Sequence, residues 1–179
     1  MRTLLRNGRI IFNVPEPWLR PEAKALKAQL DPLVPPWCLD FGWRPGCCED
    51  DAYAAIQPGW RFLDIRSFFT SIDQWRLFGL LPRELRNELR AFFRGCSYGV
   101  PEGCSFSPTL ANIYLSAIDK RWQGRCVRYG DNIAVDDRDR YADELLTIGL
   151  YAERRNTFTS RSGSGQQAGP RRPAEERSR

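Results

Sequence analysis

The sequence predicts an α+β fold in which helices back an antiparallel sheet, and three patterns lead to this prediction. Residues 126–135 read CVRYGDNIAV, with two short apolar runs flanking a Gly-Asp pair. This pattern is typical of a β-hairpin, because Gly and Asp readily adopt the positive φ that a two-residue turn requires. Residues 62–65 form another apolar run of strand length, and residues 25–33 repeat apolar side chains at helical spacing.

Length and composition are those of one globular domain. The chain has 179 residues, of which 42% are hydrophobic, which is enough for a core. It has no histidine, and its six cysteines show no CxxC spacing, which argues against a zinc site or a disulfide framework. No apolar run reaches the ~18 residues of a membrane span. No signal peptide is recognisable either, so we expect a cytoplasmic protein without a membrane partner.

The net charge of +5 comes from the C-terminal end of the chain. Residues 154–179 contain seven Arg and two Glu, whereas residues 1–153 are formally neutral. Residues 159–179 have no apolar anchor and are predicted to form a disordered basic tail. Such a tail can attract phosphates non-specifically, or it can simply be solvated.

Two aspartates in strand-like surroundings indicate metal chemistry. Asp131 stands at the tip of the predicted hairpin, and Asp64 lies inside the apolar run at residues 62–65. A buried carboxylate needs a cation or hydrogen-bond donors as partners. Two carboxylates brought together can hold two divalent ions about 4 Å apart, the arrangement that catalyses phosphoryl transfer. The alternative for Asp131 is an ordinary surface turn.

Three sequence motifs follow one another along the chain. Residues 64–72 read DIRSFFTSI, residues 99–115 read GVPEGCSFSPTLANIYL, and residues 128–132 read RYGDN. In this order they resemble motif A, the GLPQGxxxSPxLANxYL run and the RYxDD turn of motif C in bacterial reverse transcriptases of the group II intron and retron type. The resemblance covers roughly residues 6–157.

The resemblance implies a right-hand polymerase palm, an antiparallel sheet backed by helices, at residues 61–158, with partial fingers at residues 1–60. The implied activity is RNA-directed DNA polymerisation, in which dNTPs are added to a DNA or RNA primer on an RNA template. Asp64 and Asp131 are the implied catalytic residues. Two Mg²⁺ ions, with Mn²⁺ as an alternative, are the implied cofactors, and their implied ligands are Asp64, Ile65, Asp131 and Asn132.

The residues implied to contact the nucleotide are Arg9, Phe69, Pro101, Glu102 and Gly103. Arg9 follows the Asn-Gly turn of a predicted N-terminal hairpin and would reach the phosphates. Phe69 would exclude a 2′-hydroxyl and so select deoxynucleotides. The structural alternatives are an exposed hairpin charge for Arg9 and a core aromatic for Phe69. The sequence FGWR at residues 41–44 resembles an element ahead of motif A and would bring Arg44 near template or nucleotide.

Two serines are expected to cap helices. Ser67 would cap a short helix after motif A, and Ser107 would cap a helix over residues 109–122 that Pro108 opens. The sequence YADE at residues 141–144 superficially copies motif C. It lies within a helical pattern, so we reject it as the catalytic turn.

The chain departs from the family's motifs at three positions. Asn132 replaces the second carboxylate of the turn, and Glu102 replaces a Gln. Asn156 replaces the lysine of motif D. That lysine is the proposed proton donor to pyrophosphate, and Arg155 beside it is a poor acid because a guanidinium pKa lies above ~12. A primer grip and thumb are not recognisable.

Two interpretations of the chain remain open. Either a second subunit supplies a thumb, or the chain is a decayed remnant that acts as a nucleic-acid-binding or scaffold protein. An RNA-templated RNA polymerase is a third alternative, against which Phe69 argues. Intron mobility, retron function and phage defence all stay open as roles.

Overall fold

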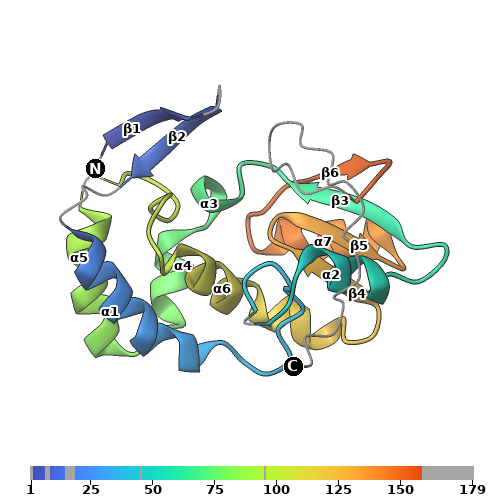
Figure 1. Ribbon diagram of the computed structural model, residues 1–179, viewed down its shortest axis with the longest axis horizontal. Helices are drawn as coiled ribbons and strands as arrows, with labels where there is room; N and C mark the ends of the chain where they lie inside the picture. Colours follow the sequence, from blue (N-terminus) through green and yellow to red (C-terminus); the bar gives the residue numbers. More distant parts are fainter. Residues whose placement is uncertain (1, 7–8, 15–18, 45, 95, 159–179) are drawn as a thin grey trace, which may run out of the picture.

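The computed structural model describes residues 2–6, 9–14, 19–44, 46–94 and 96–158. Figure 1 labels its elements, which in chain order are β1 (Arg2–Arg6), β2 (Arg9–Val14), α1 (Arg20–Leu30), the 3₁₀ turn η2 (Asp31–Leu33), α2 (Glu49–Ala55), β3 (Arg61–Ile65), α3 (Phe68–Ser71), α4 (Gln74–Gly79), α5 (Arg83–Phe93), α6 (Ser107–Arg121), β4 (Cys126–Tyr129), β5 (Asn132–Val135), α7 (Arg138–Thr147) and β6 (Ala152–Arg155). The α+β prediction is confirmed, since these residues include a four-stranded antiparallel sheet and seven α-helices.

The four-stranded sheet has the order β4-β5-β3-β6, and every neighbouring pair is antiparallel. The predicted hairpin at residues 126–135 is confirmed as β4 and β5 with Gly130 and Asp131 between them. The central strand β3 is paired on both sides, and the Cα partners of Asp64 are Asn132 in β5 and Glu153 in β6. Strand β6 was not predicted, because its sequence AERR shows no apolar alternation.

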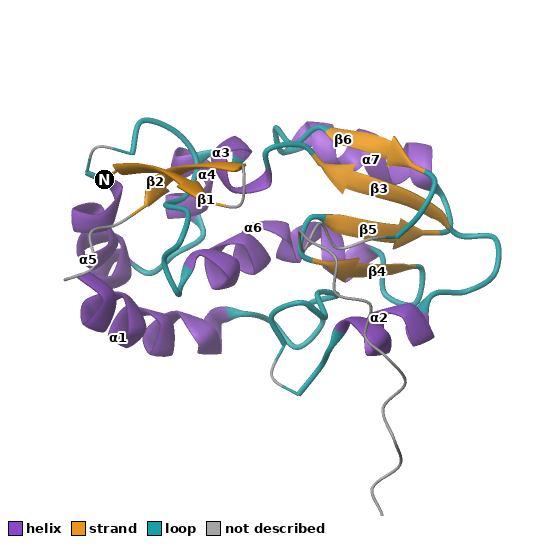
Figure 2. Ribbon diagram, turned by 45° about the horizontal axis from the view of Figure 1, so that its top comes forward, coloured by secondary structure: helices purple, strands orange, loops and turns teal. Residues whose placement is uncertain are grey.

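The two faces of the sheet carry different side chains, as the period of two in a strand requires. Leu63, Ile133 and Val135 belong to the main core, together with buried residues of α6 and α7. Phe62 and Ala134 belong to a second apolar cluster that also includes residues of α2 and Phe158. In Figure 2, α7 lies behind β3 and β6, whereas α2 lies next to β4. Residues that alternate with Leu63 and Ile133 therefore lie on the α2 side.

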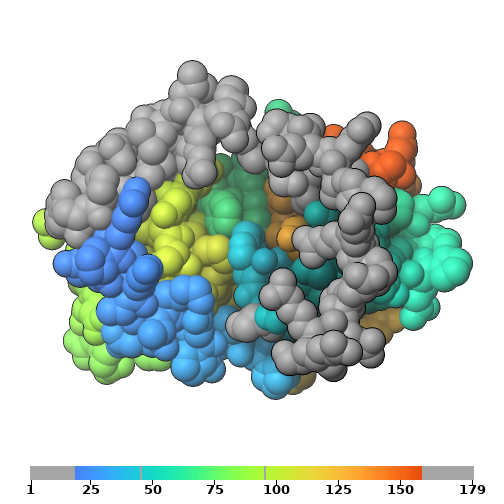
Figure 3. All heavy atoms as spheres, viewed as in Figure 1, coloured from blue at the N-terminus to red at the C-terminus, as the bar shows by residue number. Residues whose placement is uncertain are grey.

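A helical half extends the main core away from the sheet. Leu26 and Leu30 of α1 and Leu85 and Leu89 of α5 are buried in the same cluster. In the space-filling view the blue atoms of α1 lie against the yellow-green atoms of the segment that includes α5 (Figure 3). Helix α6, which buries ten of its 15 residues, runs from this half toward the sheet (Figure 1). It thereby joins the helical half to the strands.

Ser67 is the N-cap residue of α3, as predicted, but its backbone is left-handed with φ 49° and its side chain makes no capping hydrogen bond. The predicted Ser107 cap is wrong. Ser107 is the first residue of α6, whose N-cap is Phe106. The Ser107 hydroxyl donates instead to the carbonyl of Pro101. In each case the tertiary position of the loop decides the conformation, and local capping preference does not.

The N-terminal hairpin prediction agrees with the paired strands β1 and β2, in which Arg6 is the Cα partner of Arg9. The YADE segment lies within α7, as its helical pattern predicted. The predicted tail at residues 159–179 and the Asn-Gly turn at residues 7–8 lie outside the described residues. Among the described helices, none is both long and apolar enough to cross a membrane.

Candidate active site

The two predicted catalytic aspartates lie at the same end of neighbouring strands. Asp64 is the fourth residue of β3 and is 6% exposed, and its cross-strand partner Asn132 is 4% exposed. Directly paired residues share a face of the sheet, so Asp64 and Asn132 both lie on the α2 side. The amide of Ile65 donates to the carbonyl of Asp131 at 2.9 Å, which fixes the turn against the end of β3.

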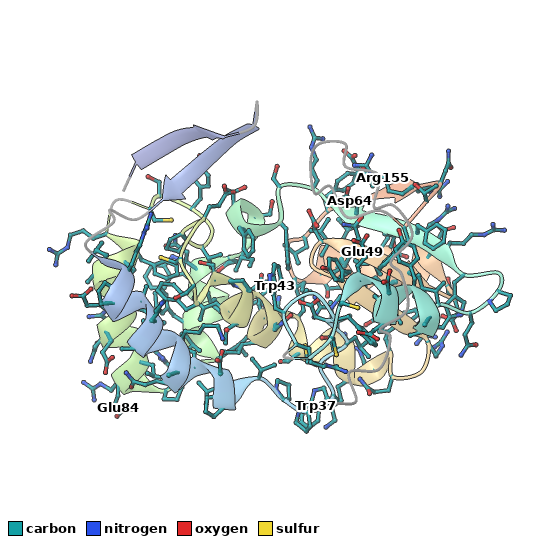
Figure 4. The ribbon with its side chains drawn as sticks, viewed as in Figure 1. Trp37, Trp43, Glu49, Asp64, Glu84 and Arg155 are labelled. Atoms are coloured by element: carbon teal, nitrogen blue, oxygen red, sulfur yellow. The ribbon has the colours of Figure 1, made fainter. Side chains whose placement is uncertain are left out.

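A cation from the same chain pairs with Asp64. Arg155 of β6 donates from Nε and Nη2 to Oδ2 of Asp64, at 3.1 and 2.8 Å. The Arg155 side chain is 32% exposed and also lies 3.5 Å from a carboxylate oxygen of Glu153. The sequence singled out Arg155 only as a poor proton donor. Its partner follows from the pairing of β3 with β6, which the sequence did not predict. Figure 4 labels Asp64 and Arg155, which lie close together at the β3–β6 pair.

Four predicted site residues line one cavity of about 290 Å³. Its lining residues are Trp43, Ser67, Phe68, Phe69, Glu102, Gly103 and Asp131. They come from the loop before α2, the start of α3, the loop before α6 and the hairpin turn. The cavity therefore brings together three of the segments in which the sequence resembles reverse transcriptase motifs. Trp43, in the FGWR element at residues 41–44, forms a wall to which the sequence analysis gave no role.

Phe69 owes its position to a close backbone approach. The amide of Val100 donates to the Phe69 carbonyl at 2.8 Å. Gly99 has φ 66°, and a Cβ atom there would lie 2.3 Å from that carbonyl oxygen. Only glycine fits this crossing without a shift of backbone. The Phe69 ring lies 5.4 Å from the Phe68 ring and 5.6 Å from the Trp43 ring, measured between centroids.

Two further hollows adjoin this cavity. One, of about 430 Å³, shares Trp43, Phe69 and Gly103 with it and adds Arg20 and Lys24 of α1. These two cations are four residues apart on one helix face, a spacing that could have identified them from sequence. The other, of about 370 Å³, is also lined by Trp43. The three together form a hollowed surface with Trp43 common to all of them.

Some predicted residues lie elsewhere. Asn156 lines a different hollow, together with Trp60 and Phe62. The guanidinium of Arg44 donates to the Cys38 carbonyl and lies over the Phe41 ring, 5.1 Å from its centroid, so it is held inside its own loop. The side chain of Arg9 lies outside the described residues.

The oxygen donors present fit a hard divalent ion, although few of them are charged. Asp64 and Asp131 supply carboxylates and Asn132 an amide oxygen, which are ligand types that Mg²⁺ and Mn²⁺ accept. The Ile65 side chain has no donor atom, so only the carbonyl oxygen of this buried residue could serve as a ligand. The Asn132 amide donates to Asp131 Oδ1 at 3.2 Å. Within the described residues no three His, Cys, Asp or Glu side chains gather into a metal-binding group.

No protein-family model matches this chain, and no curated protein matches it.

Proposed function

We propose that this chain is an RNA-directed DNA polymerase, with a palm at residues 61–158 and partial fingers at residues 1–60. The observation that supports this most is the shared cavity, to which Phe69, Glu102 and Asp131 come from three segments that are distant in sequence. Each of those segments resembles a reverse transcriptase motif, and template-directed nucleotide addition requires that all three meet. The placement of Asp64 on the strand next to Asp131 is the second support.

In this proposal Asp64 and Asp131, with the Ile65 carbonyl and the Asn132 amide oxygen, hold Mg²⁺ or Mn²⁺. When bound, the divalent ions lower the pKa of the primer 3′-hydroxyl and stabilise charge on the transferred phosphate. The protein positions the reactants around them. Gly103 lets backbone approach the nucleotide closely, because it has no Cβ. Glu102 accepts hydrogen bonds from base or sugar but cannot donate them in its ionised form.

Phe69 and the α1 cations complete the proposed nucleotide site. The Phe69 ring is half-buried between Phe68 and Trp43 and lines the cavity, so it can contact the sugar of a nucleotide bound beside Asp131. Arg20 and Lys24 line the adjoining hollow and can attract phosphates of nucleotide or template. A second subunit that supplies a thumb is the protein partner that this proposal implies, besides the RNA template and the primer.

A decayed polymerase that binds nucleic acid without extending it is the second candidate function. Two observations favour it. Arg155 neutralises Asp64, and the position after Asp131 is an amide that cannot carry charge. Both lower the negative charge available to a metal ion, and fewer charged ligands mean weaker cation binding.

Primer extension distinguishes the two candidates. Purified chain is incubated with an annealed primer on an RNA template and dNTPs, in Mg²⁺ and separately in Mn²⁺. We expect extension that is stronger in Mn²⁺ and that Asp64→Ala or Asp131→Ala abolishes. Asp143→Ala is the matched control, because this carboxylate lies in the rejected YADE segment of α7. Template binding without extension in either metal, even with a thumb-bearing second subunit supplied, would contradict the polymerase and favour the decayed form.

A further inference from the structure

The segment before α2 forms an additional edge beside the sheet. β4 is an edge strand of the four-stranded order. The Arg128 amide donates to the Leu39 carbonyl at 3.1 Å, and the Phe41 amide donates to the Arg128 carbonyl at 2.8 Å. Asp40 thereby forms an isolated parallel bridge with Arg128. This pairing brings residues 38–42 alongside the strand that leads into the Asp131 turn.

Asp40 links this segment to the turn through a single oxygen atom. Its side chain is buried, at 1% exposure. Oδ1 accepts hydrogen bonds from the amide of Gly42 at 2.8 Å and from the amide of Gly130 at 3.0 Å. Gly42 precedes Trp43, and Gly130 precedes Asp131. One carboxylate oxygen thus fixes the loop that carries the cavity wall relative to the turn that carries the proposed metal ligand.

Close packing reinforces the same relationship. A Cβ atom at Gly42 would lie 3.1 Å from the Gly130 nitrogen, so the two loops cross with little spare room. A Cβ atom at Gly130 would lie 3.6 Å from Cη2 of Trp43, which places the indole against the turn. Any rotation of the turn would therefore also move the wall that Trp43 gives to all three hollows.

Burying a carboxylate at this position costs more free energy than burying a neutral hydrogen-bond acceptor would. Burial raises the pKa of Asp40, and the nearby Arg128 opposes this effect. The positive charge of Arg128 is not devoted to Asp40, because its guanidinium already donates to Asp119 at 3.0 and 2.7 Å and to Asn112 at 3.1 Å. Oδ2 of Asp40 has no hydrogen-bond partner among the described residues. Arg128 and the amides of Gly130 and Gly42 oppose the raised pKa of Asp40, because each favours the ionised form, which binds both amides more strongly than a neutral acceptor does.

We infer that Asp40 is a positioning residue for the proposed polymerase site, holding the Asp131 turn and the Trp43 wall in one fixed relation. It touches neither nucleotide nor metal. Its effect passes through the Gly130 amide to Asp131 and through the Gly42 amide to Trp43. The inference rests on the proposed function for its consequence in catalysis, whereas the mechanical link rests on the hydrogen bonds alone.

The first test is amide hydrogen exchange at Gly130 and Gly42, measured by NMR in the full chain. Asp40→Ala removes the acceptor, and Asp40→Asn keeps a neutral one. Loss of a hydrogen bond to a charged group should speed local exchange at both amides by about tenfold to hundredfold. Asp40→Asn should show a smaller change. Cys38→Ala is the matched control, because it truncates a buried side chain of the same segment and leaves both bonds in place.

The second test uses Mn²⁺ binding by electron paramagnetic resonance and steady-state nucleotide incorporation. In Asp40→Ala we expect Mn²⁺ to bind more weakly and kcat to fall, because Asp131 is misplaced, with Asp40→Asn intermediate. Cys38→Ala should lower melting temperature without these losses. Unchanged Gly130 exchange in Asp40→Ala, or equal losses in Cys38→Ala, would overturn the inference. A wild type that extends no primer would overturn the proposed function, and the exchange results would still decide for or against Asp40.

Discussion

The guanidinium of Arg155 donates two hydrogen bonds to one oxygen of Asp64, so the first carboxylate of the site carries its own counter-ion. The pair joins the central strand of the sheet to its edge strand. A divalent ion that binds Asp64 must share this carboxylate with Arg155 or displace it. The charge at the site is therefore set by β6 as much as by the two aspartates.

Replacing Arg155 should strengthen metal binding and weaken the metal-free fold. Arg155→Gln removes the competing positive charge, so Mn²⁺ should bind more tightly by titration calorimetry. Without metal, Asp64 would be left nearly buried without this partner, at a cost of about 1–3 kcal/mol in the free energy of unfolding. Added Mn²⁺ should recover that loss. The control is Arg154→Gln, whose side chain is 70% exposed. Equal Mn²⁺ affinity in Arg155→Gln and wild type would contradict the competition.

Asn132→Asp should shift metal preference from Mn²⁺ toward Mg²⁺. The substitution replaces an amide that donates to Asp131 with a carboxylate that repels it. Melting temperature should therefore fall in EDTA and rise on addition of Mg²⁺, and primer extension in Mg²⁺ should stay equal or increase. If Mg²⁺ neither stabilises this variant nor supports extension by it, the turn is not a metal site.

Phe69→Ala should raise ribonucleotide incorporation relative to deoxynucleotide incorporation. The ring lines the cavity beside Asp131, and its removal makes room for a 2′-hydroxyl. The measurement is the ratio of kcat/KM for a ribonucleotide and the matching deoxynucleotide. Phe92→Leu serves as control, since Phe92 is 4% exposed, packs in the main core and does not line this cavity. If Phe69→Ala still prefers deoxynucleotides as strongly as the wild type, Phe69 serves only in packing.

Gly99→Ala should destabilise the fold by more than its backbone angle explains. A left-handed φ costs a non-glycine residue roughly 1–2 kcal/mol. Gly124→Ala isolates this cost, because Gly124 has φ 72° and no atom within 4 Å of an added Cβ. At Gly99 the added Cβ would also meet the backbone of Phe69 and Thr70 at 2.3 and 2.4 Å. Chemical denaturation of both variants gives the difference, and equal losses would show that the crossing near Phe69 is loose.

Thiol labelling at pH 8 should modify Cys48 long before Cys104. Cys48 is exposed, whereas burial raises the pKa of Cys104 to about 12. A raised thiol pKa means that the protonated, unreactive form persists until the pH approaches that value. Peptide mapping after brief alkylation measures the order. Cys104 lines the hollow of about 430 Å³ beside Arg20 and Lys24, so its early labelling would mean that the loop before α6 opens in solution.

Sequence reasoning succeeded where the signal is local. The hairpin around Gly130 follows from turn chemistry, and β3 follows from its apolar run. The helical assignment of the YADE segment follows from spacing. The motif resemblance implied Phe69, Glu102 and Asp131 as site residues, and all three line one cavity.

The remaining features of the site depend on contacts between distant residues, which no periodic pattern in the sequence indicates. The pairing of Arg155 with Asp64 requires the register of β3 against β6, 91 residues apart along the chain. The bond from Gly130 to Asp40 spans 90 residues. At Ser107 a favourable local capping pattern gave a wrong prediction, because the hydroxyl donates to the Pro101 carbonyl and does not cap the helix. Charged and capping residues near the site are thus poorly predicted by local rules.

The position of β3 at the centre of the sheet has a consequence for biosynthesis. Both of its partner strands, β5 and β6, are synthesised after it, and Arg155 emerges 91 residues later than Asp64. At translation rates of ~5–20 residues per second this interval lasts roughly 5 to 20 seconds. Until β5 has been synthesised, β3 has neither of its neighbouring strands and is exposed to aggregation, and its second edge stays unpaired until β6 follows. The nascent chain therefore completes its sheet only after β6 has been synthesised, and early termination before β6 would release a strand with an open edge.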